Sequence, residues 1–459
     1  MSEFKDLRSY LAFLEERKQL VRVKKEVDPA HEIAAILMKL GAQNGPAVLF
    51  ENVKGYSIPV VGGVYGTLGR VATAIGTDVK GYAEEVSRRF RQNRIPPVTV
   101  SSAPVKEVKK IGNEANLLDL PILTHNEKDV SPYITAGVLI TRDKDTGVLN
   151  ASTNRIQVCG PRDCNVHLSP GFDMFDIQRR AEQRGEPMDI TINIGTPPAL
   201  HLACVAPLPL GESELELAGA MQGQAIEIVP CETIECVAVA NAEIVIEAQV
   251  LPNVRNQEGP FSDCMGYYTG VRPTHSFKVK AITWRKDPIY QAVMAGAPAT
   301  ECDCLHWAGR QYRMWEHAKM FARDLKAVNM TVGGAGEFHI VVAMNPTMEG
   351  ETKNVIAALM ALTSIKQVVV VNDDVDIYDP VEVEWAIATR FQGDRDLVIL
   401  PDALGTPIDP SVYKGQHRVL TTKVGIDATY KGKYEDFERA KPNRDVIKKV
   451  NEEWDSYFE

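Results

Sequence analysis

The segment 257–263 (QEGPFSD) has the residue types that proton transfer requires. Its Gly-Pro pair indicates a turn, and the turn holds Glu258 and Asp263 five positions apart in an otherwise apolar, strand-rich stretch. Two carboxyl groups in a partly dry site have their pKa values pushed apart, so that one donates a proton while the other stays charged. On the segment alone, a solvated acidic turn is the favoured interpretation, because acidic turn residues are usually exposed to solvent.

A second polar cluster, 150–155 (NASTNR), precedes a strand-like run. The planar guanidinium of Arg155 is suited to hold the carboxylate of a substrate. Asn150 and a later acidic residue would together suit a hard cation, because amide and carboxylate oxygens favour magnesium or manganese over zinc. A polar surface turn is the alternative on composition alone.

Two further groups are weaker candidates for metal sites. Cys302, Cys304 and His306 offer soft ligands for zinc or copper, but no second Cys/His pair stands at zinc-site spacing, so ordinary structural side chains are favoured. Asp373, Asp374 and Asp376 follow a run of four valines. Carboxylates at a strand end can bind magnesium, although a solvated loop is more frequent.

The elements that must position these residues change in type along the chain. The first 115 residues mix both patterns, with helices expected at 4–18, 33–40 and 71–93. From about 120 to 310 the chain is rich in strands, with one helix at 172–183, which predicts a barrel-like middle domain. After Gly309, strands at 339–344, 367–371 and 397–400 alternate with helices at 352–363 and 381–390, a pattern that predicts a parallel sheet.

Length and charge exclude several classes of protein. The 459 residues, 44% hydrophobic and 24% charged, indicate a folded chain of two or three domains. A net charge of −10 without a basic run argues against binding to nucleic acid. The apolar segment 199–210 is too short and too interrupted for a membrane span, and the charged N-terminus lacks a signal peptide. Eight scattered cysteines fit a reducing cytoplasm.

Taken in order, five motifs make the chain resemble the UbiD family of reversible decarboxylases, which use prenylated FMN. They are Asn150-x-x-x-x-Arg155; Gly211-Glu-Ser213-Glu214; Glu258-Gly-Pro-Phe-x-Asp263; Val375-Asp376 with Trp385-Ala-Ile-Ala-Thr-Arg390; and Thr422-Lys423-Val424-Gly425-Ile426-Asp427. The resemblance implies a multidomain α/β (α+β) protein. We expect an N-terminal α/β domain at 1–115, a central split β-barrel for flavin and metal at 116–310, and a C-terminal α/β domain with a terminal helix at 311–459.

The resemblance also implies where the cofactor binds. Asn150, Asp173 and Glu214 would hold Mn²⁺ (or Mg²⁺), accompanied by K⁺, and the metal would bridge the protein to the cofactor phosphate. Asp173 stands where the family usually has histidine; His167 is the alternative ligand, and we favour Asp173 because hard cations prefer oxygen. The expected cofactor-binding residues are Asn150, Ser152, Thr153, Asn154, Arg155, Phe172, Asp173, Glu214 and Lys423.

The reaction implied by the resemblance is the non-oxidative decarboxylation of an aromatic, heteroaromatic or α,β-unsaturated carboxylic acid. Arg155 would hold the substrate carboxylate and keep Glu258 ionised, and Asp263 would protonate the carbon after CO₂ leaves. No side chain delocalises the carbanion on an sp² carbon, so a cofactor must act as the electron sink. Asp263 is one methylene shorter than the glutamate of many family members. To deliver its proton, its backbone would have to lie in a different place, or a water would have to carry the proton.

Two alternatives and several partners complete the expectation. A non-catalytic accessory subunit would lack the Arg/Glu/acid set, whose three positions are filled here. An ordinary FMN oxidoreductase would need a nicotinamide site, and the glycine-rich segments 61–70 and 331–338 do not match the dinucleotide fingerprint. The resemblance further implies a flavin prenyltransferase as cofactor supplier and assembly as a homodimer or homohexamer.

Overall fold

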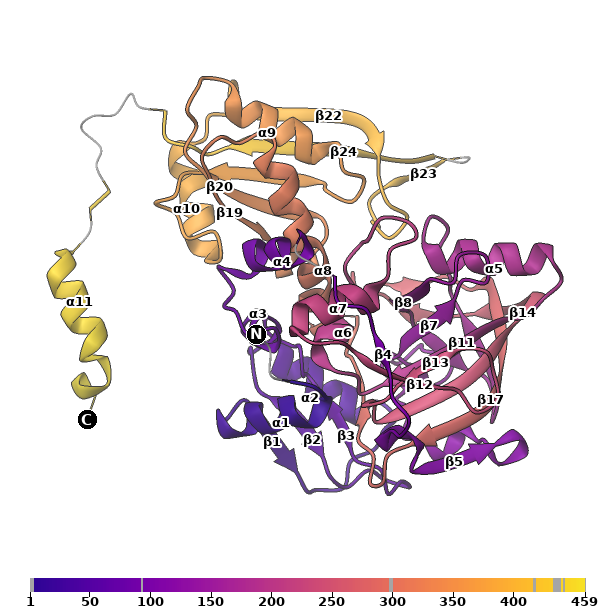
Figure 1. The fold of residues 1–459 in the computed structure, drawn as a ribbon. Coiled ribbons are helices and arrows are strands. Elements are labelled where there is room, and N and C mark those ends of the chain that lie inside the picture. The colour runs from indigo at the N-terminus through magenta and orange to yellow at the C-terminus, as the bar shows by residue number, and fades with distance from the viewer. Residues whose placement is uncertain are drawn as a thin grey trace.

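The computed structural model describes residues 4–91, 94–296, 300–415, 418–431, 439–440 and 442–458. Three sections follow one another along the chain, and the helix α11 (Arg444–Glu452) lies apart from them (Figure 1). Helices and strands occur in all three sections, which confirms the predicted mixed α/β class.

The N-terminal section is a small sheet with helices. Its helices are α1 (Leu7–Glu16), α2 (Glu32–Gly41), α3 (Leu68–Ala74) and α4 (Tyr82–Arg91). Its strands are β1 (Leu20–Val23), β2 (Ala47–Phe50) and β3 (Val60–Gly62), and β18 (Tyr290–Gln291) returns from much later in the chain to pair with β3. A capping box between Asp6 and Ser9 starts α1, and its apolar residues at helical spacing are fully or almost fully buried.

The single helix expected over 71–93 was wrong, because the chain forms two helices there. α3 ends at Ala74, and Gly76 follows with φ +72°, a left-handed conformation that favours glycine and stops a helix. The second helix, α4, starts only at Tyr82. The apolar pattern continued across the break because both helices bury one face against the same core.

The central section is a curled nine-stranded sheet. The strand order is β6 (Tyr133–Ile134), β9 (Ile156–Val158), β10 (Asp163–Val166), β17 (Arg272–Trp284), β14 (Ile244–Glu258), β11 (Met188–Ile194), β7 (Val138–Arg142) and β8 (Leu149–Thr153), with β5 (Val108–Ile111) paired to β17. The neighbours within the sheet pair antiparallel, and β14 and β17 form its longest pair. Register shifts in that pair bend the sheet, as bulges do.

Smaller elements cover this sheet. They are the strands β4 (Val98–Thr99), β12 (Glu227–Pro230) and β13 (Val237–Val239), the hairpin β15 (Phe261–Ser262) with β16 (Tyr268–Thr269), and the helices α5 (Asp173–Gln183), α6 (Pro198–Ala203) and α7 (Glu214–Gln222). Short 3₁₀ turns lie at Pro104–Lys106, Gly112–Glu114 and Leu117–Asp119. The expected helix at 172–183 is confirmed as α5, whereas the sequence did not predict α6 and α7.

The C-terminal section begins with the long helix α8 (Glu301–Lys319). The elements that follow are β19 (Leu325–Met330), a 3₁₀ turn at Val332–Gly334, β20 (His339–Met344), α9 (Glu351–Met360), β21 (Gln367–Val371), α10 (Pro380–Arg390), β22 (Leu397–Leu404), β23 (Tyr413–Gly415) and β24 (Arg418–Asp427). The 3₁₀ turn Trp454–Tyr457 follows α11. β20 and β21 pair in parallel as predicted. The prediction was wrong for the strand at 397–400, because β22 pairs antiparallel with β24. The sequence did not predict β24, which takes the parallel place beside β21, and β19 pairs antiparallel, so the sheet is mixed.

Buried charges join the N-terminal and central sections. The carboxylate of Glu243 is fully buried and accepts two hydrogen bonds of 2.8 Å from Arg8 of α1. Arg285 donates to the same carboxylate at 3.2 Å, and the backbone N–H of Ile289 donates at 3.0 Å. A buried carboxylate is costly unless it is paired, so these contacts fix α1 beside the start of β14.

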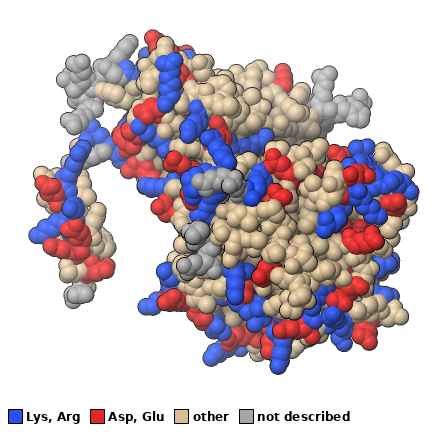
Figure 2. Space-filling model, in the orientation of Figure 1, with Lys and Arg blue, Asp and Glu red and all other residues tan. Residues whose placement is uncertain are grey.

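The surface carries both signs of charge. Figure 2 shows Lys and Arg interspersed with Asp and Glu over the visible face. None of the helices in the described part of the chain combines the length and the apolar character needed to cross a bilayer.

Candidate active site

A buried ion pair joins Arg155 to Glu258. Arg155 follows β8, and Glu258 is the last residue of the long strand β14. Nε of Arg155 donates to Oε1 at 2.9 Å and Nη2 donates to Oε2 at 3.1 Å, which is the two-pronged geometry of strong guanidinium–carboxylate pairs. The Glu258 side chain is 1% exposed. Burial raises the pKa of Glu258, but the hydrogen bonds and charge of Arg155 outweigh it and hold that pKa below its ordinary value.

Asp263 lies in the loop of the β15–β16 hairpin, beside this pair. Its backbone N–H donates to the carbonyl of Tyr267 at 3.0 Å, and its Oδ1 accepts from the N–H of Met265 at 2.9 Å. Burial raises the pKa of Asp263 above its ordinary value, although these backbone groups and the charge of Arg155 act in the opposite direction. The two carboxyl groups are therefore pushed apart in pKa, as the sequence predicted.

Arg272 is a neighbour that sequence reasoning missed. It is the first residue of β17, directly across from Glu258 in the antiparallel register. Its Nε lies 3.8 Å from Oε2 of Glu258, and burial lowers the pKa of this guanidinium. The pairing of β14 with β17 would have revealed it, because opposite residues of an antiparallel pair share a face.

Two aromatic rings and one histidine lie near the ion pair. The guanidinium of Arg155 lies 5.3 Å from the ring centre of Phe261, which packs on Tyr133 at 4.2 Å between ring centres. Burial and then the positive charges of Arg272 and Arg155 lower the pKa of His167 to about 4, so its ring is neutral at pH 7. The site thus combines an apolar wall with a cationic edge.

Asn150, Asp173 and Glu214 form a second group of polar side chains. Nδ2 of Asn150 donates to Oε2 of Glu214 at 3.2 Å, and the N–H of Ala151 donates to that oxygen at 2.8 Å. Burial raises the pKa of Glu214 to about 7, with a further rise from the negative charge of Asp173. Oδ1 of Asn150 is buried without a hydrogen-bond partner among the described residues.

Local contacts explain how this second group is held. Glu214 begins α7 immediately after Ser213, whose hydroxyl donates to the carbonyl of Leu149 at 2.6 Å and fixes α7 on β8. Asp173 begins α5, and its Oδ2 accepts from the N–H of Gly211 at 3.0 Å. The set of amide and carboxylate oxygens, one of them unpaired, fits a hard divalent cation.

The other predicted cofactor residues are placed less uniformly. Ser152 donates to Oδ1 of Asn154 at 2.7 Å, and Asn154 donates to the carbonyl of His167 at 3.1 Å, while Thr153 ends β8 half-buried. Phe172 precedes α5 and is 63% exposed. Ser152, Thr153 and Asn154 lie on the stretch of chain between Asn150 and Arg155, whereas Phe172 lies beside Asp173 in the sequence.

Lys423 lies elsewhere, in β24 of the C-terminal sheet. Its Nζ is buried and donates to the carbonyl of Leu362 at 2.5 Å and to that of Thr363 at 3.4 Å. No contact in the described ranges joins Lys423 to Asn150 or Glu214. Its pairing with a cofactor phosphate stays a prediction.

Basic side chains of the protein pair with the acidic residues that follow β21. Asp374 receives two hydrogen bonds from Arg390, at 2.9 and 2.6 Å, and Asp376 lies 2.9 Å from Nζ of Lys80. These pairs favour the structural interpretation of the run over a magnesium site.

Comparison with known proteins places all three sections in one family. Residues 11–90, 97–298 and 305–428 match, in turn, the N-terminal, Rift-related and C-terminal domains of 3-octaprenyl-4-hydroxybenzoate carboxy-lyase. An anhydromevalonate phosphate decarboxylase of Methanothermobacter thermautotrophicus is 36% identical over 89% of this chain and 93% of its own. A phenolic acid decarboxylase of Sedimentibacter hydroxybenzoicus is 34% identical over 93% of this chain and 92% of its own.

Solved structures agree with these relatives. The UbiD-class enzyme HmfF of Pelotomaculum thermopropionicum, in complex with FMN, has a TM-score of 0.90 and 40% identity, covering 97% of this chain and 99% of its own. An evolved dimeric form of that enzyme, in complex with prenylated FMN, has a TM-score of 0.87 and 38% identity, covering 97% and 98% of the two chains.

Proposed function

Because the chain belongs to the UbiD family of carboxy-lyases, we propose that it catalyses the reversible, non-oxidative decarboxylation of an aromatic, heteroaromatic or α,β-unsaturated carboxylic acid with prenylated FMN. The observation that carries the proposal is the buried Arg155–Glu258 pair with Asp263 beside it. A cation for the leaving carboxylate, a charged glutamate and an acid with a raised pKa stand together at one site.

Arg155 is assigned to the substrate carboxylate. Glu258 engages its Nε and Nη2, which leaves Nη1 as the donor edge for the substrate. The same pair keeps Glu258 ionised, and Arg272 adds a second positive charge at that carboxylate. The cationic edge would orient the substrate with its carboxylate toward Arg155.

Asp263 is assigned to protonation of the carbon after CO₂ leaves. Its raised pKa favours the protonated carboxyl, which is the form that donates. The bound flavin would supply the electron sink that side chains lack. Phe261 and Tyr133 would exclude water from the reacting carbon.

Asn150, Asp173 and Glu214 are assigned to Mn²⁺ or Mg²⁺, with K⁺ nearby, at the cofactor phosphate. The unpaired Asn150 Oδ1 and the two carboxylates support this donor set. Asp173 suits the role of third metal ligand better than His167. The charge of Asp173 raises the pKa of Glu214, which places Asp173 near that carboxylate, whereas the charges that act on His167 include those of Arg155 and Glu258. A bound cation would relieve the repulsion between the two carboxylates.

The cellular setting follows from the same proposal. A cytoplasmic flavin prenyltransferase would supply the cofactor, and the protein would assemble as a homodimer or homohexamer. The domain boundaries at 115/116 and 310/311 are part of the proposal.

Co-expression with a flavin prenyltransferase tests the proposed function. We expect the absorbance and mass of prenylated FMN on the purified protein and release of CO₂ from at least one acid in a panel of aromatic, furan-type and α,β-unsaturated acids. An accessory subunit would bind no prenylated flavin and release no CO₂ alone, and an FMN oxidoreductase would bind plain FMN and oxidise NAD(P)H. Either result would replace the proposal.

A further inference from the structure

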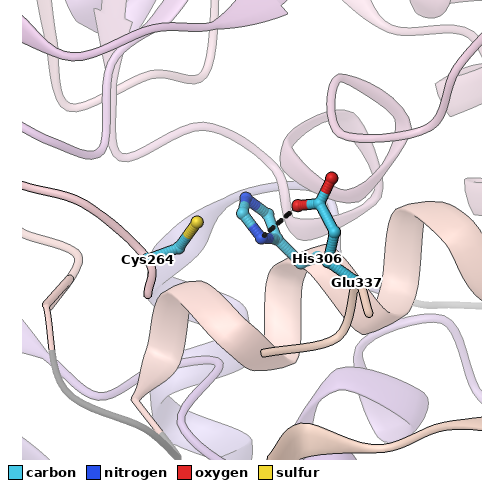
Figure 3. Close-up of side chains that lie close together, drawn as sticks. All are labelled: Cys264, His306 and Glu337. Carbon is cyan, nitrogen blue, oxygen red and sulfur yellow. Dashed lines mark ion pairs between the residues drawn. The ribbon is translucent and has the colours of Figure 1, made fainter. Parts of the chain in front are cut away.

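Three potential metal ligands from different parts of the chain meet outside the site described above. Cys264 lies in the β15–β16 loop, His306 on the second turn of α8, and Glu337 between the 3₁₀ turn Val332–Gly334 and β20. One ligand atom of each lies within 4.8 Å of the other two. Figure 3 shows the imidazole between the thiol and the carboxylate.

Two atoms of this cluster that have no hydrogen-bond partner in the described part of the chain face each other. Oε2 of Glu337 lies 3.8 Å from Nδ1 of His306, and both atoms are buried without a hydrogen-bond partner among the described residues. The Glu337 side chain is only 7% exposed. Burial lowers the pKa of His306 to about 3, so the ring is neutral at pH 7 and the two atoms form no ion pair. A neutral imidazole with a free nitrogen is the form that binds a metal.

The surrounding chain fixes the ligands in place. Oε1 of Glu337 is held 3.1 Å from Nη2 of Arg310, which leaves Oε2 to face His306. Gly336 lies so close to α8 that a Cβ there would stand 2.6 Å from the Asp303 carbonyl oxygen. This close approach presses the loop that carries Glu337 onto the helix that carries His306. Such support from outside the ligand shell is usual at metal sites.

A second thiol stands at the edge of the cluster. Cys302 lies one helical turn before His306, with its Sγ 3.9 Å from Nε2 of that ring. The sequence singled out Cys302 and His306 but showed no partners at zinc-site spacing. The fold brings Cys264 and Glu337 next to His306, from 38 positions before and 35 positions after Cys302.

We propose that Cys264, His306 and Glu337 bind a zinc ion, separate from the oxygen-ligand site at Asn150, Asp173 and Glu214. Thiolate and imidazole ligands suit zinc, whereas hard oxygen ligands suit manganese. Sulfur and nitrogen ligands of a tetrahedral zinc stand ~3.6 Å apart, given Zn–S ~2.3 Å and Zn–N ~2.1 Å. The observed limit of 4.8 Å thus requires a closure of about 1 Å.

Binding also has a defined proton balance. Burial raises the pKa of the Cys264 thiol, so the free site holds a thiol and a neutral imidazole. Zn²⁺ replaces the thiol proton, and one proton per zinc leaves to solvent with no redox change. Because Cys264 follows Asp263, the ion would also restrict the loop that carries the proposed proton donor.

Metal titration of the flavin-free protein tests the site. After chelator treatment, Zn²⁺ is added to wild type and to a Glu214→Gln variant, which weakens the oxygen-ligand site. We expect one tightly bound zinc per chain in both by elemental analysis, with release of one proton in weakly buffered solution. Co²⁺ in place of zinc should give a thiolate-to-cobalt charge-transfer band.

Matched variants decide whether the cluster is responsible. Cys264→Ser and Glu337→Gln should each lower zinc affinity at least tenfold, and Cys264→Ser should abolish the cobalt band, whereas Cys159→Ser at an exposed cysteine should change neither. Loss of the band in Cys302→Ser as well would add that thiol as a fourth ligand. Zinc binding that is absent in wild type, or unchanged in both Cys264→Ser and Glu337→Gln, would overturn the proposal. No readout depends on decarboxylase activity.

Discussion

At the scale of single residues, the opposite pKa shifts of Glu258 and Asp263 distinguish their roles. Glu258 is buried and Asp263 is half-buried, but only Glu258 receives the two hydrogen bonds of a guanidinium. The neighbours of each carboxyl group, and not the residue type, therefore decide which one stays ionised and which one can donate a proton.

The Glu258 pair predicts a pH-dependent stability. Since the folded-state pKa of Glu258 is lowered, its stabilisation is present above the ordinary carboxyl pKa and is lost as the pH falls through the folded-state value. Glu258→Gln should cost about 3 kcal/mol at pH 7 and much less near pH 3. Thermal unfolding of wild type and variant across this range measures the difference. Glu16→Gln, on the exposed face of α1, is the control, and a pH-independent loss in Glu258→Gln would contradict the assignment.

Asp263 predicts a defect confined to proton transfer. Asp263→Asn should leave flavin binding intact but slow exchange of the departing position with solvent deuterium by about 10²–10⁴-fold. Asp263→Glu restores a carboxyl and should retain part of the exchange. Equal exchange rates in wild type and Asp263→Asn, measured by NMR, would remove Asp263 from the mechanism.

At the scale of elements, α7 and β8 together hold the proposed cation. Glu214→Gln keeps the shape of the side chain but removes its charge, so we expect co-purified manganese and flavin to fall at least tenfold. Elemental analysis and flavin absorbance of the purified protein check this. Glu216→Gln, two residues later on the same helix, should leave both unchanged; retained flavin in Glu214→Gln would contradict the phosphate bridge.

The helix α8 makes its own prediction through Gly309. A Cβ at this position would stand 1.9 Å from the carbonyl oxygen of Val205, a backbone atom that cannot rotate away. Gly309→Ala should therefore cost about 1–3 kcal/mol or more. Gly69→Ala in α3, whose nearest neighbour lies 4.0 Å away, should be neutral or slightly stabilising. Denaturant unfolding of both variants makes the comparison, and equal midpoints would refute it.

The sequence predicted elements best where the pattern was purely local. The strands at 188–194, 339–344 and 367–371 form as expected, because alternating or continuous β-branched residues define them without help from the rest of the chain. The helices α6 and α7 escaped prediction, since prolines and glycines surround them and both are buried nearly all round. Their formation depends on packing that no local pattern records.

At the scale of the whole molecule, only those site residues that belong to sequence motifs could be predicted. Arg155, Glu258 and Asp263 do come together, but Arg272 enters through strand pairing, and Glu337 reaches Cys264 only through the packing of a loop on α8. Lys423 shows the converse, because its motif matches the family while its described contacts are carbonyls of its own section.

The separate helix α11 predicts self-association. Its exposed apolar side chains, with those of the turn that follows, are Val446, Ile447, Trp454, Tyr457 and Phe458. Such a surface on a helix apart from the body of the protein (Figure 1) suits a second copy of the chain. Ending the chain at residue 441 should lower the oligomeric state measured by light scattering, whereas Lys448→Ala should not. An unchanged mass for the truncated protein would place the contact elsewhere.

The buried carboxylate of Glu243 has a consequence for anyone dividing this chain. Residues 97–298 match one domain model, which suggests that they could be expressed alone. Yet excising them discards Arg8, and with it both of the shortest hydrogen bonds to an anion that water does not reach. Arg285 and Ile289 would still donate to Glu243 in such a fragment, but the loss of Arg8 should lower its stability, so crystallographers and engineers would do better to keep the first helix attached.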